Sequence, residues 1–80
     1  MIGGAQVRAA RSLLRWTVQD LAERSKVSLP TIHRLEQHDG APPVRERTLH
    51  DIVRAFEEAG IEFIGTPDEP GVILRRREPR

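Results

Sequence analysis

The side chains best suited to recognise a ligand are grouped in residues 17–37, which read TVQDLAERSKVSLPTIHRLEQ. Apolar and small residues recur there at helical spacing, namely Leu21, Ala22, Val27, Ile32 and Leu35. The residues between them in the second half include a histidine, an arginine and several hydroxyls. This pattern predicts two short helices joined by a tight turn. Such a pair can hold its second helix away from a small core, where that helix can enter the major groove of DNA.

Start signals for both helices are present in this segment. Thr17 and Asp20 have the spacing of a capping box, in which the hydroxyl and the carboxylate each accept a hydrogen bond from a backbone N–H. Ser28 is a favourable N-cap residue for the second helix. Pro30 then falls in the first turn, where a missing N–H is tolerated. We therefore expect side-chain caps on both helices.

The segment resembles the Cro/cI-like helix-turn-helix of the xenobiotic-response-element (XRE) family of bacterial and phage regulators. The residues that carry the resemblance are Leu21, Ala22, Val27, Ser28, Thr31, Ile32, Arg34, Leu35 and Glu36, with Trp16 and Thr17 directly before them. The resemblance extends from Gln6 to Ala59 and implies an all-α, lambda-repressor-like domain of four to five helices that binds double-stranded DNA. Two positions depart from the family pattern. Lys26 stands where the family often has Gly in the turn, and Val18 where it often has a Gln that contacts a phosphate.

By this resemblance, base edges should meet the start and outer side of the second helix of the pair, at Leu29, Pro30, His33 and Arg34. Arg34 is the strongest candidate because a guanidinium can bond O6 and N7 of guanine together. The alternative for Arg34 is a phosphate contact or a solvated arginine. Leu29 and Pro30 can offer a thymine methyl only apolar contact. His33 is either a donor to DNA or an exposed histidine without a role.

Contacts to the DNA backbone are expected from residues that flank this helix, namely Thr17, Ser28, Thr31, Gln37, Arg45 and Arg47. Thr17 and Ser28 lie at predicted helix N-termini, where N–H groups and the helix dipole favour phosphate, although both also serve as caps. Arg45 and Arg47 are included because the loop before the fourth helix often follows the DNA backbone in the family.

The resemblance also implies one structural salt bridge. In the family, an arginine of the first helix pairs with the glutamate that ends the second helix of the motif, and Arg11 and Glu36 match these positions. A partly buried pair there would fix the docking angle of the helix rather than read sequence. Its net contribution to stability can be near zero.

Two more helices are predicted around the motif. The first is expected over residues 6–15. Residues 38–43, HDGAPP, break helical structure and predict a loop. A further helix should open at Thr48, which repeats the capping-box spacing with an acidic residue three positions on, and close at Gly60. A short fifth helix near residues 44–47 is an alternative for that region.

The last twenty residues predict a β-hairpin. Residues 61–64 and 72–74 have strand character, and residues 65–71 between them are rich in turn formers. An isolated hairpin is marginal in water and exposes its edges, so we expect a second copy to cover it. The alternative is that the strands pack on the chain's own helices. The residues expected at a dimer interface are Ile61, Phe63, Ile64, Val72, Ile73 and Leu74.

These patterns divide the chain into a helix-turn-helix domain, residues 1–60, and a C-terminal hairpin with a basic tail, residues 61–80. The tail holds Arg75, Arg76 and Arg77, which are either solvated or add salt-dependent affinity for DNA. Residues 1–54 contain nine Lys and Arg against six Asp and Glu, a net charge of +3, whereas residues 55–80 contain four against six, a net charge of −2. The positive charge therefore lies with the motif.

Composition excludes several other classes of protein. Eighty residues make one small domain, and the absence of cysteine excludes disulfides and thiolate zinc sites and fits a reducing cytoplasm. No stretch of the sequence is long and apolar enough to span a membrane, and the N-terminus lacks a signal-peptide pattern. His33, His38 and His50 lack the carboxylate pattern of a metal site, and no nucleophile elbow or phosphate-binding glycine loop occurs. We expect no enzyme activity, cofactor or metal.

The sequence therefore predicts a sequence-specific DNA-binding transcriptional regulator. Because such domains commonly act in symmetric pairs, we expect a homodimer on a twofold-symmetric operator. Repression by occlusion of a promoter is the expected mechanism for so small a domain. The alternative is an antitoxin or adaptor of the same fold, whose main role is to bind a protein partner such as a toxin through the C-terminal tail.

Overall fold

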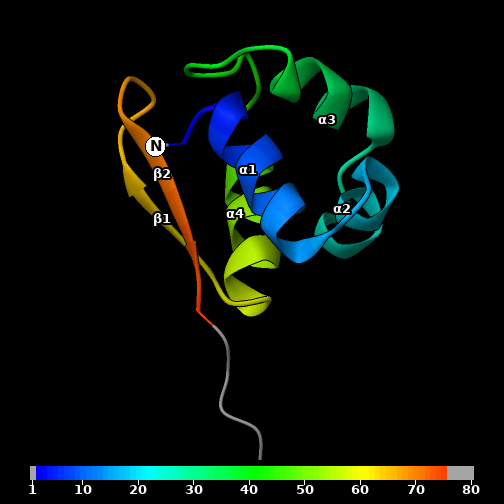
Figure 1. The fold of residues 1–80 in the computed structure, drawn as a ribbon. Coiled ribbons are helices and arrows are strands. Elements are labelled where there is room, and N and C mark those ends of the chain that lie inside the picture. The colour runs from blue at the N-terminus through cyan, green and yellow to red at the C-terminus, as the bar shows by residue number, and fades with distance from the viewer. Residues whose placement is uncertain (1, 76–80) are drawn as a thin grey trace, which may run out of the picture.

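The computed structural model describes residues 2–75, which form four helices followed by a two-stranded antiparallel sheet (Figure 1). The elements are α1 (Gly4–Leu14), α2 (Val18–Ser25), α3 (Leu29–Glu36), α4 (Glu46–Glu58), β1 (Ile61–Gly65) and β2 (Pro70–Leu74). The predicted helices and the C-terminal hairpin are thus present. Of the helices in residues 2–75, none has both the length and the apolar character needed to cross a membrane.

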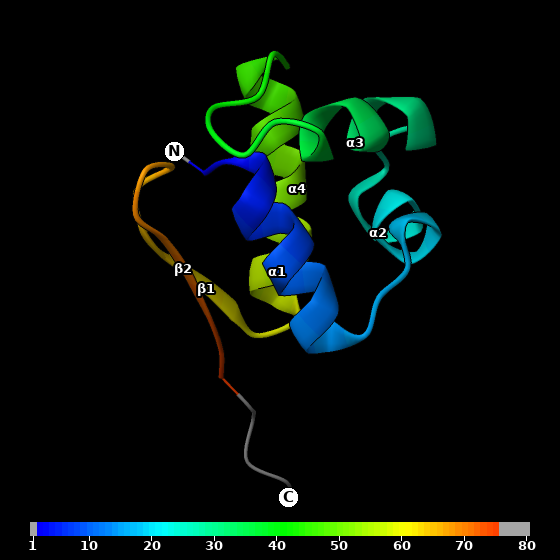
Figure 2. The same ribbon diagram turned by 45° about the horizontal axis from the view of Figure 1, so that its top comes forward.

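A small apolar core joins the motif to the hairpin through α4. Figure 2 shows α1 lying across α4, with α2 and α3 on one side and the hairpin on the other. Phe56 of α4 is fully buried, as are Leu21 of α2 and Ile32 of α3. Trp16 stacks on Phe56 with ring centroids 5.5 Å apart, and Phe63 of β1 meets the same ring edge-on at 5.7 Å. One aromatic side chain therefore packs against both halves of the molecule.

The first helix begins two residues earlier than predicted, at Gly4 rather than Gln6. Its first N–H groups are bonded to the loop that follows α3, since the N–H of Gly4 donates to the carbonyl of Gly40 at 3.2 Å. The side-chain oxygen of Gln6 accepts a hydrogen bond from the N–H of Gly3 at 3.0 Å. Contacts with residues far along the chain thus extend this helix at its N-terminus.

The start of α4 was also predicted wrongly. The helix begins at Glu46, so Thr48 lies in its first turn and does not cap it. Arg45 occupies the N-cap position without a side-chain cap, and its carbonyl accepts the N–H of Leu49 at 3.1 Å. In the described chain, residues 44–47 form no separate helix, since Glu46 and Arg47 already belong to α4. The helix ends where predicted, before Gly60, whose φ of 102° is left-handed.

One side of the hairpin packs on the chain's own helices. Ile61 is buried, and Phe63, Val72 and Leu74 are partly buried against the core. The register agrees with this arrangement, because Ile61 pairs with Leu74 and Phe63 with Val72, so all four side chains share one face. Four of the six residues expected at a dimer interface therefore pack within the chain, and dimerisation through the hairpin stays a prediction.

Gln6 also fastens the hairpin to α1. Its side chain is 2% exposed, and its amide donates to the carbonyls of Ile64, at 2.9 Å, and Gly71, at 3.1 Å. At the end of β2, Arg75 donates from Nε to the Glu62 carboxylate at 2.5 Å. Arg76 and Arg77 of the basic tail lie outside the described residues.

Candidate nucleic-acid interface

Helix α3 turns one side into the core and the other to solvent. Ile32 and Leu35 are fully buried, and Glu36 is 9% exposed. The opposite side presents the four residues predicted to read bases, Leu29, Pro30, His33 and Arg34, together with Gln37 directly after the helix, all of them exposed. Within residues 2–75, the Arg34 guanidinium takes part in no ion pair. The structure thus brings these side chains together, and their contacts with bases stay a prediction.

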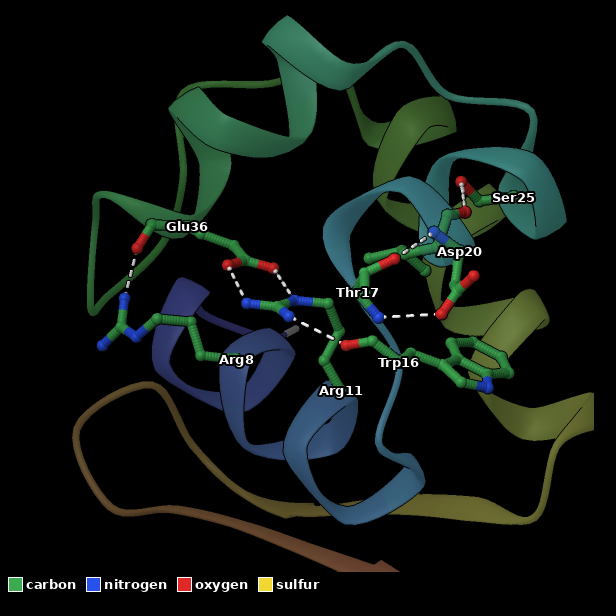
Figure 3. Close-up of polar contacts among 8 residues, drawn as sticks. Arg8, Arg11, Trp16, Thr17, Asp20, Ser25 and Glu36 are labelled. Atoms are coloured by element: carbon green, nitrogen blue, oxygen red, sulfur yellow. Dashed lines mark hydrogen bonds and ion pairs between the residues drawn. The ribbon is translucent and has the colours of Figure 1, made fainter.

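The start of α2 is closed by the predicted capping box (Figure 3). The Thr17 hydroxyl oxygen accepts the N–H of Asp20 at 3.0 Å, and the Asp20 carboxylate accepts the N–H of Thr17 at 2.9 Å. At the other end of α2, the Ser25 hydroxyl donates to the carbonyl of Leu21 at 2.7 Å. The start of this helix is therefore satisfied by side chains of its own segment.

The start of α3 differs, and its predicted side-chain cap is wrong. Ser28 occupies the N-cap position, but its hydroxyl donates to the Thr31 hydroxyl at 3.0 Å instead of accepting a backbone N–H. An N-cap oxygen accepts from the second or third helical N–H. The second position here is Pro30, which has no N–H, and the third, Thr31, offers a competing hydroxyl. The first turn of α3 keeps no side-chain cap, and exposed N–H groups at a helix start suit a phosphate.

The turn between the two helices is left-handed at Lys26. Its φ is 64° and its ψ is 25°, and its N–H donates to the carbonyl of Ala22 at 2.9 Å. A side chain in this conformation costs about 1 kcal/mol relative to Gly. The turn is therefore left-handed at a residue that carries a Cβ, at a cost in the energy of the turn.

The C-terminal end of α3 is held by Arg11 of α1 (Figure 3). Arg11 donates from Nε and Nη2 to the two carboxylate oxygens of Glu36, at 2.8 and 2.9 Å, and from Nη1 to the carbonyl of Trp16 at 2.9 Å. The Arg11 and Glu36 side chains are 21% and 9% exposed. The hydrogen bond to Glu36 raises the pKa of Arg11 above its ordinary value, although partial burial opposes the shift. One guanidinium thus ties α3 to α1 and to the segment that leads into α2.

A second arginine of α1, which the sequence analysis missed, supports the same joint. Arg8 donates to the backbone carbonyl of Glu36 and to the Asp39 carboxylate (2.5 Å). It lies three residues before Arg11 and therefore on the same side of α1. The three-residue spacing between Arg8 and Arg11 was the signal in the sequence that could have identified Arg8.

The close approach of α1 to the end of α3 also depends on a glycine that the sequence analysis passed over. A Cβ added to Gly4 would lie 1.9 Å from the carbonyl oxygen of His38 and 2.4 Å from that of Leu35. No other residue fits there without movement of the backbone. The signal was the Gly3-Gly4 pair just ahead of the helix that was predicted to begin at Gln6.

The remaining residues predicted to contact the DNA backbone are dispersed around α3. Arg45 and Arg47 are exposed at the start of α4, after the loop that leaves α3. Thr31 is half-buried in the first turn of α3, and Thr17 is exposed at the start of α2. Their contacts with phosphates stay a prediction.

Four short helices, with two of them joined by a tight turn and the second presented to solvent, define the helix-turn-helix class of protein. A family model described as a helix-turn-helix domain matches residues 4–62, and the chain belongs to this family. The matched residues cover all four helices and end at the second residue of β1. None of the curated proteins compared with the chain matches it.

Proposed function

We propose that the protein binds double-stranded DNA in a sequence-specific manner through α3 and represses transcription as a homodimer on a twofold-symmetric operator. The observation that carries this proposal is the two-sided character of α3. Ile32, Leu35 and Glu36 anchor the helix, and every residue predicted to read bases lies on its exposed side. A helix that is fixed along one side and free along the other is the geometry that the major groove accepts.

The reading surface is apolar with one strong donor. Leu29 is 39% exposed, and it stands beside Pro30. The chemistry of these side chains supports a division of roles. Leu29 and Pro30 would make apolar contact with thymine methyls, and Arg34 would bond to guanine. His33 adds a weaker donor on the same side.

Backbone contacts would supply most of the affinity. The first turn of α3 lacks a side-chain cap, so phosphate can meet its exposed N–H groups near Ser28. Arg45, Arg47 and Gln37 are exposed around the helix and suit the same role. Thr17 already caps α2, and its hydroxyl is the weakest candidate of the set.

Selection of DNA sites from a random pool tests the proposal directly. We expect an enriched motif with twofold symmetry, bound with an affinity that falls steeply with salt while the sequence preference is retained. When the motif is placed across a promoter, addition of the protein should lower transcription in vitro. An adaptor of the same fold would enrich no motif and show no sequence preference at any salt concentration, and that result would overturn the proposal.

A further inference from the structure

The outer edge of β2 carries unpaired backbone groups. In an antiparallel ladder, alternate residue pairs exchange both backbone hydrogen bonds, and the intervening pairs direct their N–H and C=O groups away from the partner strand. Thr66 and Glu69 bond each other in both directions, and the N–H of Arg75 donates to the carbonyl of Gly60 at 2.8 Å. With the observed register, these bonds leave the backbone N–H and C=O groups of Val72 and Leu74 directed away from β1, at the free edge of β2. Within residues 2–75, their N–H groups have no acceptor.

An uncharged hollow lies beside this edge. It is formed between β2 and α1, which run side by side (Figures 1 and 2), and it is lined by Ala5, Gln6, Ala9, Pro70, Gly71 and Val72. Ala5 and Ala9 recur at four-residue spacing on α1, and Leu13, which continues the series, is 45% exposed. Small side chains on the helix and an open strand edge leave space for one more strand.

The edge of β1 has the opposite character. The groove beside it, between β1 and α4, has an apolar floor and three carboxylates, and its lining residues are Ile2, Glu46, Leu49, His50, Val53, Glu57, Glu62 and Phe63. Glu62 is paired with Arg75, but Glu46 and Glu57 take part in no ion pair within residues 2–75, so pairing of two copies through this edge would bring like charges together, which is unfavourable. Charge therefore distinguishes the two edges and favours β2.

We propose that a second copy of this chain adds its β2 to this edge, antiparallel about a twofold axis at Val72. In this register, the N–H of Val72 donates to the carbonyl of Val72 of the second copy, and the N–H of Leu74 donates to the carbonyl of Pro70 of the second copy. Pro70 has no N–H of its own, so every outward donor of β2 finds an acceptor. The result is one continuous sheet, ordered β1–β2–β2–β1, across the dimer.

This interface depends on the homodimer in the proposed function and replaces the side-chain contacts first expected of the hairpin. The inner side chains of both strands already pack on the chain's own helices. Besides the outer side chains of Ile64 and Ile73, the backbone of β2 and the strip on α1 remain open to a second copy. An unprotected strand edge beside uncharged residues is a template for such pairing.

Amide hydrogen exchange across a protein concentration series, with the mass followed by sedimentation, tests the register without DNA. The Val72 and Leu74 amides should exchange at least about tenfold more slowly as the dimer forms. Phe63, whose N–H points outward from β1, is the internal control and should not change. A chain that stays monomeric at about 100 μM, a concentration well above that needed for a stable dimer, would overturn the interface, as would protection of Phe63 in place of Val72.

Two substitutions test the edge and the hollow separately. Val72→Pro removes an outward N–H that the hairpin itself does not use, and an edge strand tolerates proline there. Ala9→Glu places a carboxylate in the hollow, and Ala41→Glu, in the exposed loop after α3, is the matched control. Both test variants should weaken the dimer at least about tenfold, whereas Ala41→Glu should leave it unchanged. Thermal unfolding of each variant reports whether the fold is retained.

The test of the β2 interface can succeed or fail independently of the test of DNA binding. A monomer that still selects a DNA motif would overturn this interface and leave the DNA-binding proposal standing. A dimer with protected Val72 that selects no motif would support the interface and overturn the DNA-binding proposal. If Val72→Pro and Ala9→Glu fold and dimerise as tightly as the natural chain, the edge of β2 is not the interface.

Discussion

The two helices of the motif are fixed in opposite ways. Helix α2 is secured within its own segment, because Thr17 and Asp20 close its first turn. Helix α3 has no side-chain cap at its start and is held at its far end by Arg11. The helix offered to DNA thus takes its support from α1, which leaves its first turn free for an external partner. Support from the far end is therefore what orients the candidate reading surface.

The largest expected loss of stability follows from removal of the side chain that holds the C-terminal end of α3. Arg11→Ala leaves the nearly buried Glu36 carboxylate without its bidentate partner, and we expect a loss of about 3 kcal/mol in the free energy of unfolding. Urea denaturation followed by circular dichroism measures it. The double variant Arg11→Met/Glu36→Leu should recover most of this loss, because no buried charge is left unpaired.

An exposed ion pair serves as the control for this prediction. Arg54 and Glu58 on α4 are 70% and 71% exposed and 3.6 Å apart. Arg54→Ala should change the free energy of unfolding by less than about 0.5 kcal/mol. Equal losses in Arg11→Ala and Arg54→Ala would show that α3 does not depend on α1 for support.

The second prediction concerns the free side of α3. Arg34→Ala should weaken binding to the selected DNA site by about 2 kcal/mol and relax the preference at one base pair. The free energy of unfolding should stay within about 0.5 kcal/mol of that of the natural chain, since Arg34 is exposed. Gel-shift titrations on the selected site and on single-base variants measure both affinity and preference.

Arg47→Ala is the matched comparison for Arg34→Ala. If Arg47 contacts a phosphate, its loss should weaken binding to all sequences alike and lower the salt slope by about 1. Uniform weakening by Arg34→Ala as well would reassign Arg34 to the DNA backbone and leave α3 without its main reading group.

The third prediction compares the two helix starts directly. Thr17→Ala removes a hydroxyl that accepts a backbone N–H and should cost about 1 kcal/mol of stability. Ser28→Ala removes a hydroxyl that bonds only another hydroxyl, so its cost should be about 0.3 kcal/mol, well below that of a functioning cap. Chemical denaturation of the two variants side by side measures the difference. Equal losses of stability would contradict the conclusion that the start of α2 is capped by a side chain and the start of α3 is not.

Features that depend on neighbours in sequence were predictable, and features that depend on distant residues were not. The capping box of α2 is a three-residue relation, and it forms as predicted. Ser28 is an exception within the local range, because Pro30 and the Thr31 hydroxyl, two and three residues on, displace its cap, whereas Thr48 fails because α4 begins two residues before it. Only at Thr48 did the surrounding backbone override the local capping signal.

The joint between α1 and α3 shows the limit of sequence reasoning most clearly. Arg11 and Glu36 are 25 residues apart, and family resemblance was the guide to their pairing. Gln6 bonds carbonyls that lie 58 and 65 residues along the chain, and nothing in its surroundings in the sequence marks it as the fastening of the hairpin. Such contacts are set by how the helices pack.

The smallest expected effect lies in the turn between the two helices, at Lys26. Lys26→Gly relieves the left-handed backbone of a Cβ, a gain of about 1 kcal/mol, but Gly also makes the unfolded chain more flexible, so the net gain should be about 0.5 kcal/mol. Lys26→Ala keeps the Cβ and loses the amine, and it should match the natural chain in stability. A gain in both variants would assign the cost to the lysine charge, and a loss in Lys26→Gly would mean that the turn is held by contacts of the Lys26 side chain. In the expected order of stability, Lys26→Gly is more stable than both Lys26→Ala and the natural chain. That order would show that backbone strain alone limits the stability of the turn between α2 and α3.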